Sequence, residues 1–150
     1  MLIEPNPTNV CFGCGGGNAR GMKLTFDQDN EARMIRGRFR LGAEYQGAFG
    51  IIHGGVIALV LDEVMGKVCR FRGVRAVTAE MNIEYLKPVR VDADVIVEGY
   101  EKEIDGRNLH LVGEIKDESG KLLARSRGRF VILGQAQKTE HGAAQPISST

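Results

Sequence analysis

The chain has 150 residues and a formal net charge of +1, from 20 Lys and Arg against 19 Asp and Glu. This length suits one domain with a buried core, and the balanced charge argues against nucleic acid or an acidic membrane as a partner. Three cysteines and a start without a basic segment and apolar core favour a reducing, cytoplasmic setting over secretion. The longest uncharged apolar run, residues 48–61, is too short to span a bilayer.

Residues 1–22 are predicted to be an irregular segment. Its Cys11-Phe12-Gly13-Cys14 motif could form half of a zinc site, but no second cysteine pair follows it. The remaining cysteine, Cys69, and the three histidines show no ligand spacing, and no strand-to-helix pattern frames a redox pair. We therefore expect no metal and no cofactor, and a glycine-rich segment folded over the surface.

Residues 23–134 are predicted to form the domain itself. Residues 23–28 are expected to form a short first strand. In residues 35–41 apolar positions alternate with arginines, which indicates a second strand with one buried face. A loop over residues 42–52 then leads into a helix.

That helix begins at Gly54 and is the element around which the chain is organised. Six consecutive apolar residues, 56–61, make nearly every side of it apolar, which predicts a buried helix. Its first turn has no Ser, Thr, Asp or Asn cap, so a ligand oxygen could approach the backbone N–H groups at Gly54 and Gly55. The alternative is that these glycines only permit a tight turn into the helix.

The middle of the helix carries a carboxylate, Asp62, with Glu63 beside it. Helical spacing places Asp62 on a stripe of small residues: Gly55, Ala58, Gly66 and Cys69. The larger residues that we expect to face the core are Ile57, Leu61, Val64 and Val68. A buried carboxylate is costly, so Asp62 is either bonded to a neighbouring loop or functional.

Gly54 and Asp62 are too far apart to act together within one chain. They lie eight residues apart, or roughly 12 Å along a helix axis. If both are catalytic, the donor of one chain meets the carboxylate of another. Two such helices about a twofold axis would form two sites per dimer.

The rest of the chain is predicted to be strand. Alternating runs indicate strands over residues 77–85, 91–102, 109–115 and 122–133, with a hairpin turn at residues 104–107. Residues 135–150 are patternless and predicted to be disordered. One long helix with five or six antiparallel strands implies an α+β fold with the sheet curled around the helix.

The chain resembles the hotdog-fold acyl-CoA thioesterases, in particular the group similar to phenylacetyl-CoA thioesterase. The match consists of Tyr45-Gln46-Gly47-x-x-Gly50-x-x-His53-Gly54-Gly55, then Asp62, then the strand at residues 77–85 with Thr78, followed by Lys87-Pro88. The opening Cys11-Phe12-Gly13-Cys14 with Asn18-x-x-Gly21 also resembles a start seen in part of the group.

The resemblance implies roles for individual residues. Asp62 is the catalytic carboxylate, acting as general base or nucleophile, and Thr78 orients water or this carboxylate. Gly54 is the backbone donor to the thioester carbonyl, and His53 and Gln46 are supporting groups. The positions expected to bind substrate are Gly55, Asn82 and Glu63, with Glu63 also the alternative carboxylate.

The resemblance further implies a homodimer joined through its sheets, often paired into a tetramer, with sites at the dimer interface. The expected reaction is hydrolysis of a small or medium acyl-CoA, aliphatic or aromatic, to free acid and CoA. Two other functions stay open: a non-catalytic acyl-CoA-binding protein, and a hydratase or dehydratase on the same fold. The sequence leaves undecided the acyl group and the choice between CoA and acyl-carrier protein.

Overall fold

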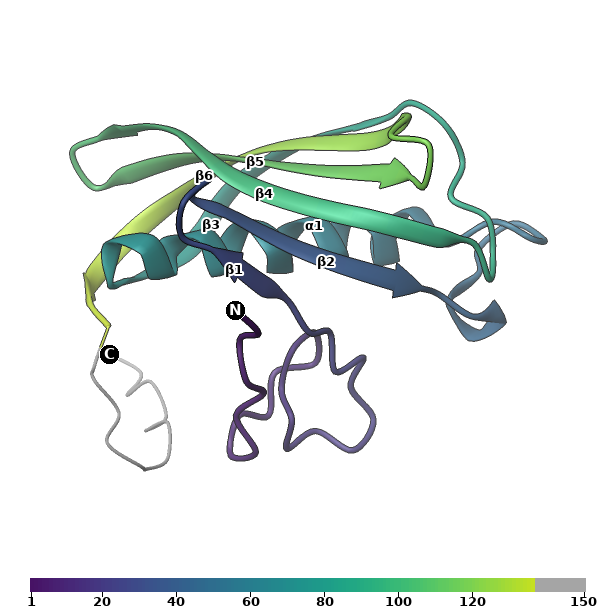
Figure 1. Ribbon diagram of the computed structural model, residues 1–150, viewed down its shortest axis with the longest axis horizontal. Coiled ribbons are helices and arrows are strands. Elements are labelled where there is room, and N and C mark those ends of the chain that lie inside the picture. Colours follow the sequence, from purple (N-terminus) through teal and green to yellow (C-terminus); the bar gives the residue numbers. More distant parts are fainter. Residues whose placement is uncertain (137–150) are drawn as a thin grey trace.

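A six-stranded antiparallel sheet curves around one long helix in the computed structural model, which describes residues 1–136 (Figure 1). The helix is α1 (Gly54–Val68), and short 3-10 turns occur at η1 (Ala43–Tyr45) and η2 (Cys69–Arg72). The strands are β1 (Asp27–Asp29), β2 (Met34–Arg40), β3 (Val74–Tyr85), β4 (Asp94–Asp105), β5 (Asn108–Asp117) and β6 (Leu122–Gln135). They are ordered β1-β2-β4-β5-β6-β3. The predicted α+β architecture, a sheet wrapped around a central helix, is confirmed.

One side of α1 forms the centre of the core. The buried helix residues are Ile57, Val60, Leu61, Val64, Met65 and Val68, which confirms the predicted core-facing set. The expectation of burial on nearly every side is wrong for this chain. Ala58, Asp62 and Gly66 are only half-buried, because the sheet covers one side of the helix and leaves the small stripe open.

Gly99 on β4 allows the helix to approach the sheet closely. A Cβ atom at this position would lie 2.9 Å from the backbone oxygen of Val64. Real Cβ atoms do not come that near to a backbone oxygen, so a larger residue would push α1 away from β4. The distance between helix and sheet therefore depends on this glycine.

Strand β3 lies at one edge of the sheet and pairs only with β6 in the described chain. Its register with β6 shifts between Thr78 and Glu80, so Ala79 forms a β-bulge. Such a bulge leaves one residue without a partner and changes which side chains share a face. Thr78 pairs with the buried Phe130, and beyond the bulge Met81 pairs with the buried Gly128.

The N-terminal segment has no regular strand before β1, later than the predicted start at residue 23. Leu24 and Phe26 are nonetheless buried in the core, and Ile3 N–H donates to the Phe26 carbonyl at 2.8 Å. This contact lays the start of the chain beside β1. The predicted disordered tail lies outside the described residues, except that Gln135 ends β6 and Ala136 follows it.

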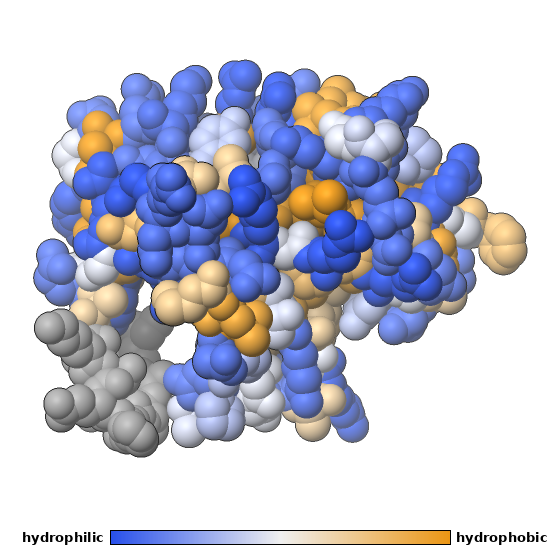
Figure 2. Space-filling view, in the orientation of Figure 1, coloured by the Kyte–Doolittle hydropathy of each residue, from blue (hydrophilic) through white to orange (hydrophobic). Residues whose placement is uncertain are grey.

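The outer face of the sheet, away from α1, carries ion pairs. Hydrophilic side chains cover most of the face shown in Figure 2. Each arginine of β2 meets a carboxylate, and two arginines of β6 do the same: Arg36–Glu98, Arg38–Glu118, Arg40–Asp94, Arg125–Glu114 and Arg129–Glu80. The positive charge of the arginines on β2 and β6 is therefore largely neutralised by carboxylates of the same chain. Within residues 1–136, no helix is long and apolar enough to cross a membrane.

Candidate active site

Asp62 and Thr78 meet on the open side of the helix. The Thr78 hydroxyl donates to Asp62 Oδ1 at 2.6 Å, which joins the edge strand β3 to the middle of α1. Asp62 is half-buried, so this bond fixes the rotamer of a carboxylate that still faces solvent. The structure thus brings together the two residues that the sequence placed at the centre of the site.

A hollow of about 450 Å³ opens at this pair. It is lined by Asp62, Glu63, Gly66, Lys67, Ala76, Val77, Thr78 and Phe130. The small residues Gly66 and Ala76 leave room beside the carboxylate, as the helical stripe predicted. A group in this hollow would contact charged side chains and a hydroxyl as well as apolar side chains.

The bulge at Ala79 explains why Thr78 reaches the helix. A regular strand would place Thr78 and Asn82 on the same face, because residues an even number apart share a face. The bulge changes this alternation, so Thr78 faces α1 while Glu80 and Asn82 face outward beside Arg129 and Arg127. The alternation predicted over residues 77–85 holds only beyond the bulge.

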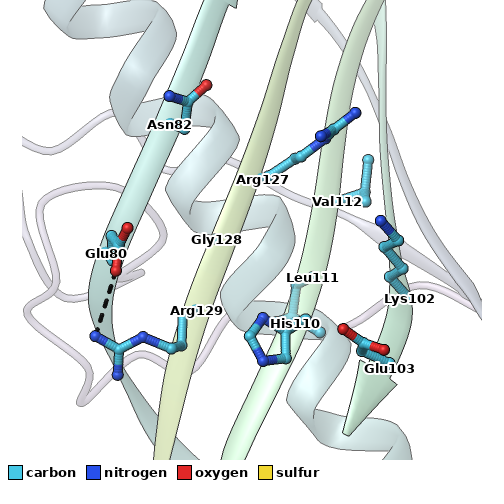
Figure 3. Close-up of a pocket in the computed structure, with 10 residues that line it drawn as sticks. All are labelled: Glu80, Asn82, Lys102, Glu103, His110, Leu111, Val112, Arg127, Gly128 and Arg129. Carbon is cyan, nitrogen blue, oxygen red and sulfur yellow. Dashed lines mark hydrogen bonds and ion pairs between the residues drawn. The ribbon is translucent and has the colours of Figure 1, made fainter.

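Asn82 consequently lies apart from Asp62. It lines a separate hollow of about 200 Å³ on the outer face, together with Glu80, Lys102, His110 and Arg127 among others (Figure 3). Figure 3 shows α1 behind the sheet and Glu80 joined to Arg129 across this face. The structure does not bring Asn82 to the carboxylate, and its role in binding substrate stays a prediction.

The start of α1 has a cap that the sequence did not predict. His53 is the N-cap residue, and its Nδ1 atom accepts a hydrogen bond from the Gly55 N–H at 2.8 Å. Gly55 therefore has its donor occupied within the chain, and the expectation of two free donors is wrong. Among residues 1–136 no acceptor takes the Gly54 N–H, and Gly54 is exposed. One helix donor thus remains available at this end.

Gln46 and Tyr85 hold the helix start in place. Gln46 Oε1 accepts from the Gly50 N–H at 3.1 Å, so this side chain closes the loop before the helix. The Tyr85 hydroxyl donates to the Gly54 carbonyl at 2.9 Å. The end of β3 is therefore fastened to the start of α1, a contact that the sequence did not predict.

Glu63 faces the N-terminal segment. Cys11 Sγ donates to Glu63 Oε1 at 3.3 Å, and Lys67 donates to Cys14 Sγ at 3.0 Å. Sequence reasoning missed both contacts. A helical spacing of four between Glu63 and Lys67 was the available signal, since such residues share a helix face.

The comparisons with known proteins agree with this geometry. The family model described as the thioesterase superfamily matches residues 49–124, which is just over half of the chain. The chain belongs to the thioesterase superfamily. Its matched region runs from the loop before α1 to β6 and so contains both Asp62 and Thr78.

Individual relatives support this membership. The chain is 35% identical over 85 residues to acyl-coenzyme A thioesterase THEM4 of Rattus norvegicus, covering 57% of this chain and 36% of that protein. It therefore spans about a third of the length of this curated relative. A thioesterase superfamily protein, RHA08564, matches with TM-score 0.73 and 30% identity over 78% of this chain and 57% of that one. The PaaI protein of E. coli shares the fold, with TM-score 0.65 and 18% identity over 69% of this chain and 75% of that one.

Proposed function

We propose that this protein is an acyl-CoA thioesterase, which hydrolyses a small or medium acyl-CoA to free acid and CoA. The hydrogen bond between Thr78 and Asp62 in an open, partly apolar hollow carries this proposal. Membership of the thioesterase superfamily and the acyl-coenzyme A thioesterase name of a relative support it.

The chemistry follows from the positions of three groups. Hydrolysis of a thioester needs an activated water or a nucleophile, and donors for the oxyanion that develops on the carbonyl. Asp62 supplies the first, either by taking a proton from water or by attacking the carbonyl carbon itself. Thr78 holds the carboxylate by donating to Oδ1, and the free Gly54 N–H supplies the oxyanion donor.

A homodimer would complete the site. Asp62 touches Thr78 near one end of β3, whereas Gly54 touches Tyr85 at the other end. If β3 pairs in antiparallel fashion with β3 of a second copy, the Thr78 end of one strand lies beside the Tyr85 end of the other. The Gly54 donor of one protomer then lies beside the Asp62 carboxylate of its partner, and the twofold axis passes near Met81 and Asn82.

Exposed apolar side chains also support pairing through the free edge of β3. Phe49, in the loop before α1, is 96% exposed, and Val77, Tyr85 and Leu86 on or next to β3 are about half-exposed. A long free edge strand with apolar side chains is a ready surface for pairing with another chain. We propose that a second copy of this chain covers it.

Thiol release from a panel of acyl-CoAs tests the function. The panel comprises short, medium and long aliphatic chains together with phenylacetyl and benzoyl groups. Release at a specificity above about 10⁴ M⁻¹s⁻¹, the low end for enzymes, supports the proposal and identifies the substrate class. Binding without release indicates a non-catalytic acyl-CoA-binding protein. An enoyl-CoA is assayed beside the panel, and its hydration without thiol release indicates a hydratase.

A further inference from the structure

Two thiols and a carboxylate converge where the N-terminal segment crosses α1. The ligand atoms of Cys11, Cys14 and Glu63 all lie within 4.8 Å of one another, and Cys11 Sγ is 3.3 Å from Glu63 Oε1. We propose that this cluster binds one thiophilic divalent metal ion of the zinc class, which joins the N-terminal segment to the helix. The inference rests on none of the observations that carry the thioesterase proposal, and Glu63 is the one ligand that also lines the hollow beside Asp62.

Hydrogen bonds within the N-terminal segment, and a glycine between the cysteines, hold both thiols in this position. Asn9 Oδ1 accepts from the Cys11 N–H at 2.9 Å, and the Gly15 N–H donates to the Cys11 carbonyl at 2.9 Å. Gly13 lies between the cysteines, and a Cβ atom there would be 2.5 Å from Glu63 Oε1. Glycine at this position therefore lets the loop lie against the carboxylate without displacing the Glu63 side chain. Both thiols therefore face one side chain of α1 on an ordered loop.

The spacing of the ligand atoms is compatible with one metal ion between them. Zinc lies about 2.3 Å from thiolate sulfur and about 2.0–2.2 Å from carboxylate oxygen, which puts neighbouring ligand atoms about 3.4–3.8 Å apart. The ligand atoms already lie within 4.8 Å of one another, so a contraction of about 1 Å would reach these separations. In residues 1–136 the cluster offers three protein ligands, so water would take the fourth position.

The charges balance when the metal binds. Each thiol loses its proton to solvent as its sulfur forms a bond to the metal, so one ion releases two protons while the Glu63 carboxylate binds as it is. Two thiolates and one carboxylate around a divalent ion carry a net charge of −1. The Lys67 ammonium, 3.0 Å from Cys14 Sγ, offsets that charge and donates a hydrogen bond to the ligating sulfur.

Zinc and cobalt binding to the full chain test the site. The purified, reduced protein is stripped with a chelator and titrated with Zn²⁺ against a chromophoric chelator, and bound metal per chain is measured by mass spectrometry. Co²⁺ is then added, because thiolate-to-cobalt charge-transfer absorption reports sulfur ligation in the unaltered protein. The variants are Cys11→Ser, Cys14→Ser and Glu63→Gln, with Cys69→Ala as the matched control in the buried core.

We expect one metal ion per chain in the wild type and in Cys69→Ala, with thiolate-to-cobalt absorption and a rise in melting temperature on adding zinc. Either serine variant should lower the zinc affinity at least 100-fold, and Glu63→Gln should lower it about 10-fold. Absence of cobalt–thiolate absorption in the wild type would overturn the proposal, whatever the variants do. So would equal zinc affinity in the wild type and a folded Cys11→Ser variant, or a Cys11–Cys14 disulfide in a protein that binds no metal.

Discussion

Thr78 on the edge strand donates a 2.6 Å hydrogen bond to Asp62 in the middle of the helix. This contact connects the free edge strand β3 to the central helix α1. It holds a half-buried carboxylate in one orientation beside a hollow lined by both polar and apolar residues. The first two predictions therefore concern this pair.

Asp62→Asn should lower kcat for acyl-CoA hydrolysis by about 10²–10⁴-fold, because the amide can neither take a proton from water nor attack the carbonyl. The neighbouring change Glu63→Gln is the comparison, because Glu63 is the alternative carboxylate, and it should lower kcat much less than Asp62→Asn. Steady-state thiol release on the best substrate of the panel measures both. If Glu63→Gln is the inactive variant, the catalytic carboxylate is Glu63.

Thr78→Ala should lower kcat about 10-fold to 100-fold, the range for loss of one hydrogen bond to a charged group. Thr78→Ser keeps the hydroxyl and should stay within a few-fold of the wild type. The comparison separates hydrogen bonding from packing, since both variants remove the methyl group. Equal losses in the two variants would assign Thr78 a packing role.

Asn82→Cys should form a disulfide-linked dimer under mild oxidation. Asn82 is exposed on β3 close to the proposed twofold axis, where directly opposite residues have Cβ atoms about 4.5–5.5 Å apart. The change is made in a chain whose three native cysteines are replaced, and the product is read on a non-reducing gel. Ile104→Cys, exposed near the β4–β5 turn, is the control and should remain monomeric on that gel. Equal cross-linking of the two would argue against pairing through β3.

Gly99→Ala should destabilise the fold by about 1–3 kcal/mol, because its Cβ would press on the backbone of Val64 and push α1 off the sheet. Gly134→Ala, at a position on β6 where a Cβ meets nothing within 4 Å, is the matched control. Urea unfolding followed by circular dichroism gives both values. A Gly99→Ala protein as stable as the control would mean that the helix can shift at no cost.

Arg72 and Glu101 join η2 to β4 and predict a pH dependence. Two hydrogen bonds of 2.6 and 2.7 Å from Arg72 hold the pKa of Glu101 below its ordinary value of 4.5. A folded-state pKa below the unfolded one stabilises the protein above pH 4.5, and this stability is lost as the pH falls through the folded pKa. Glu101→Gln should therefore cost up to about 1 kcal/mol near neutral pH and nothing at lower pH.

Glu118→Gln is the control for that measurement, because the Arg38–Glu118 pair is mostly exposed and should contribute little at any pH. Denaturant midpoints across pH 3–7 compare the two variants with the wild type. If the denaturant midpoint of Glu101→Gln stays below that of the wild type by the same amount at the lowest pH, the ion pair is not the cause of the lost stability.

The strands and the helix could be predicted because their hydrophobic periods are regular. Ile57, Leu61, Val64 and Val68 recur at helical spacing and are all buried against the sheet. The one-sided burial of α1 could not be predicted from those residues. It depends on how far the sheet curls, and a run of apolar residues carries no information about that.

Within the site, Asp62 was singled out as a carboxylate in the middle of an apolar helix, whereas Thr78 was named only through the resemblance to the hotdog-fold thioesterases. Asn82 was grouped with Thr78 because strict alternation puts them on one face, and only the bulge at Ala79 separates them. The His53 cap was missed because Ser, Thr, Asp and Asn are the usual caps. The contacts of Cys11 and Cys14 with α1 connect residues about fifty positions apart, and local patterns do not show such contacts.

The bulge at Ala79 also divides β3 into two parts with different constraints. Residues after it keep the apolar pattern that packs against the helix, while Thr78, just before it, faces α1 and the candidate site with the opposite parity. A substitution at position 78 would thus change the hydrogen bond to Asp62 without changing which residues beyond the bulge face the helix. Conversely, loss of a single residue at the bulge would turn the Thr78 hydroxyl toward the outer face of the sheet.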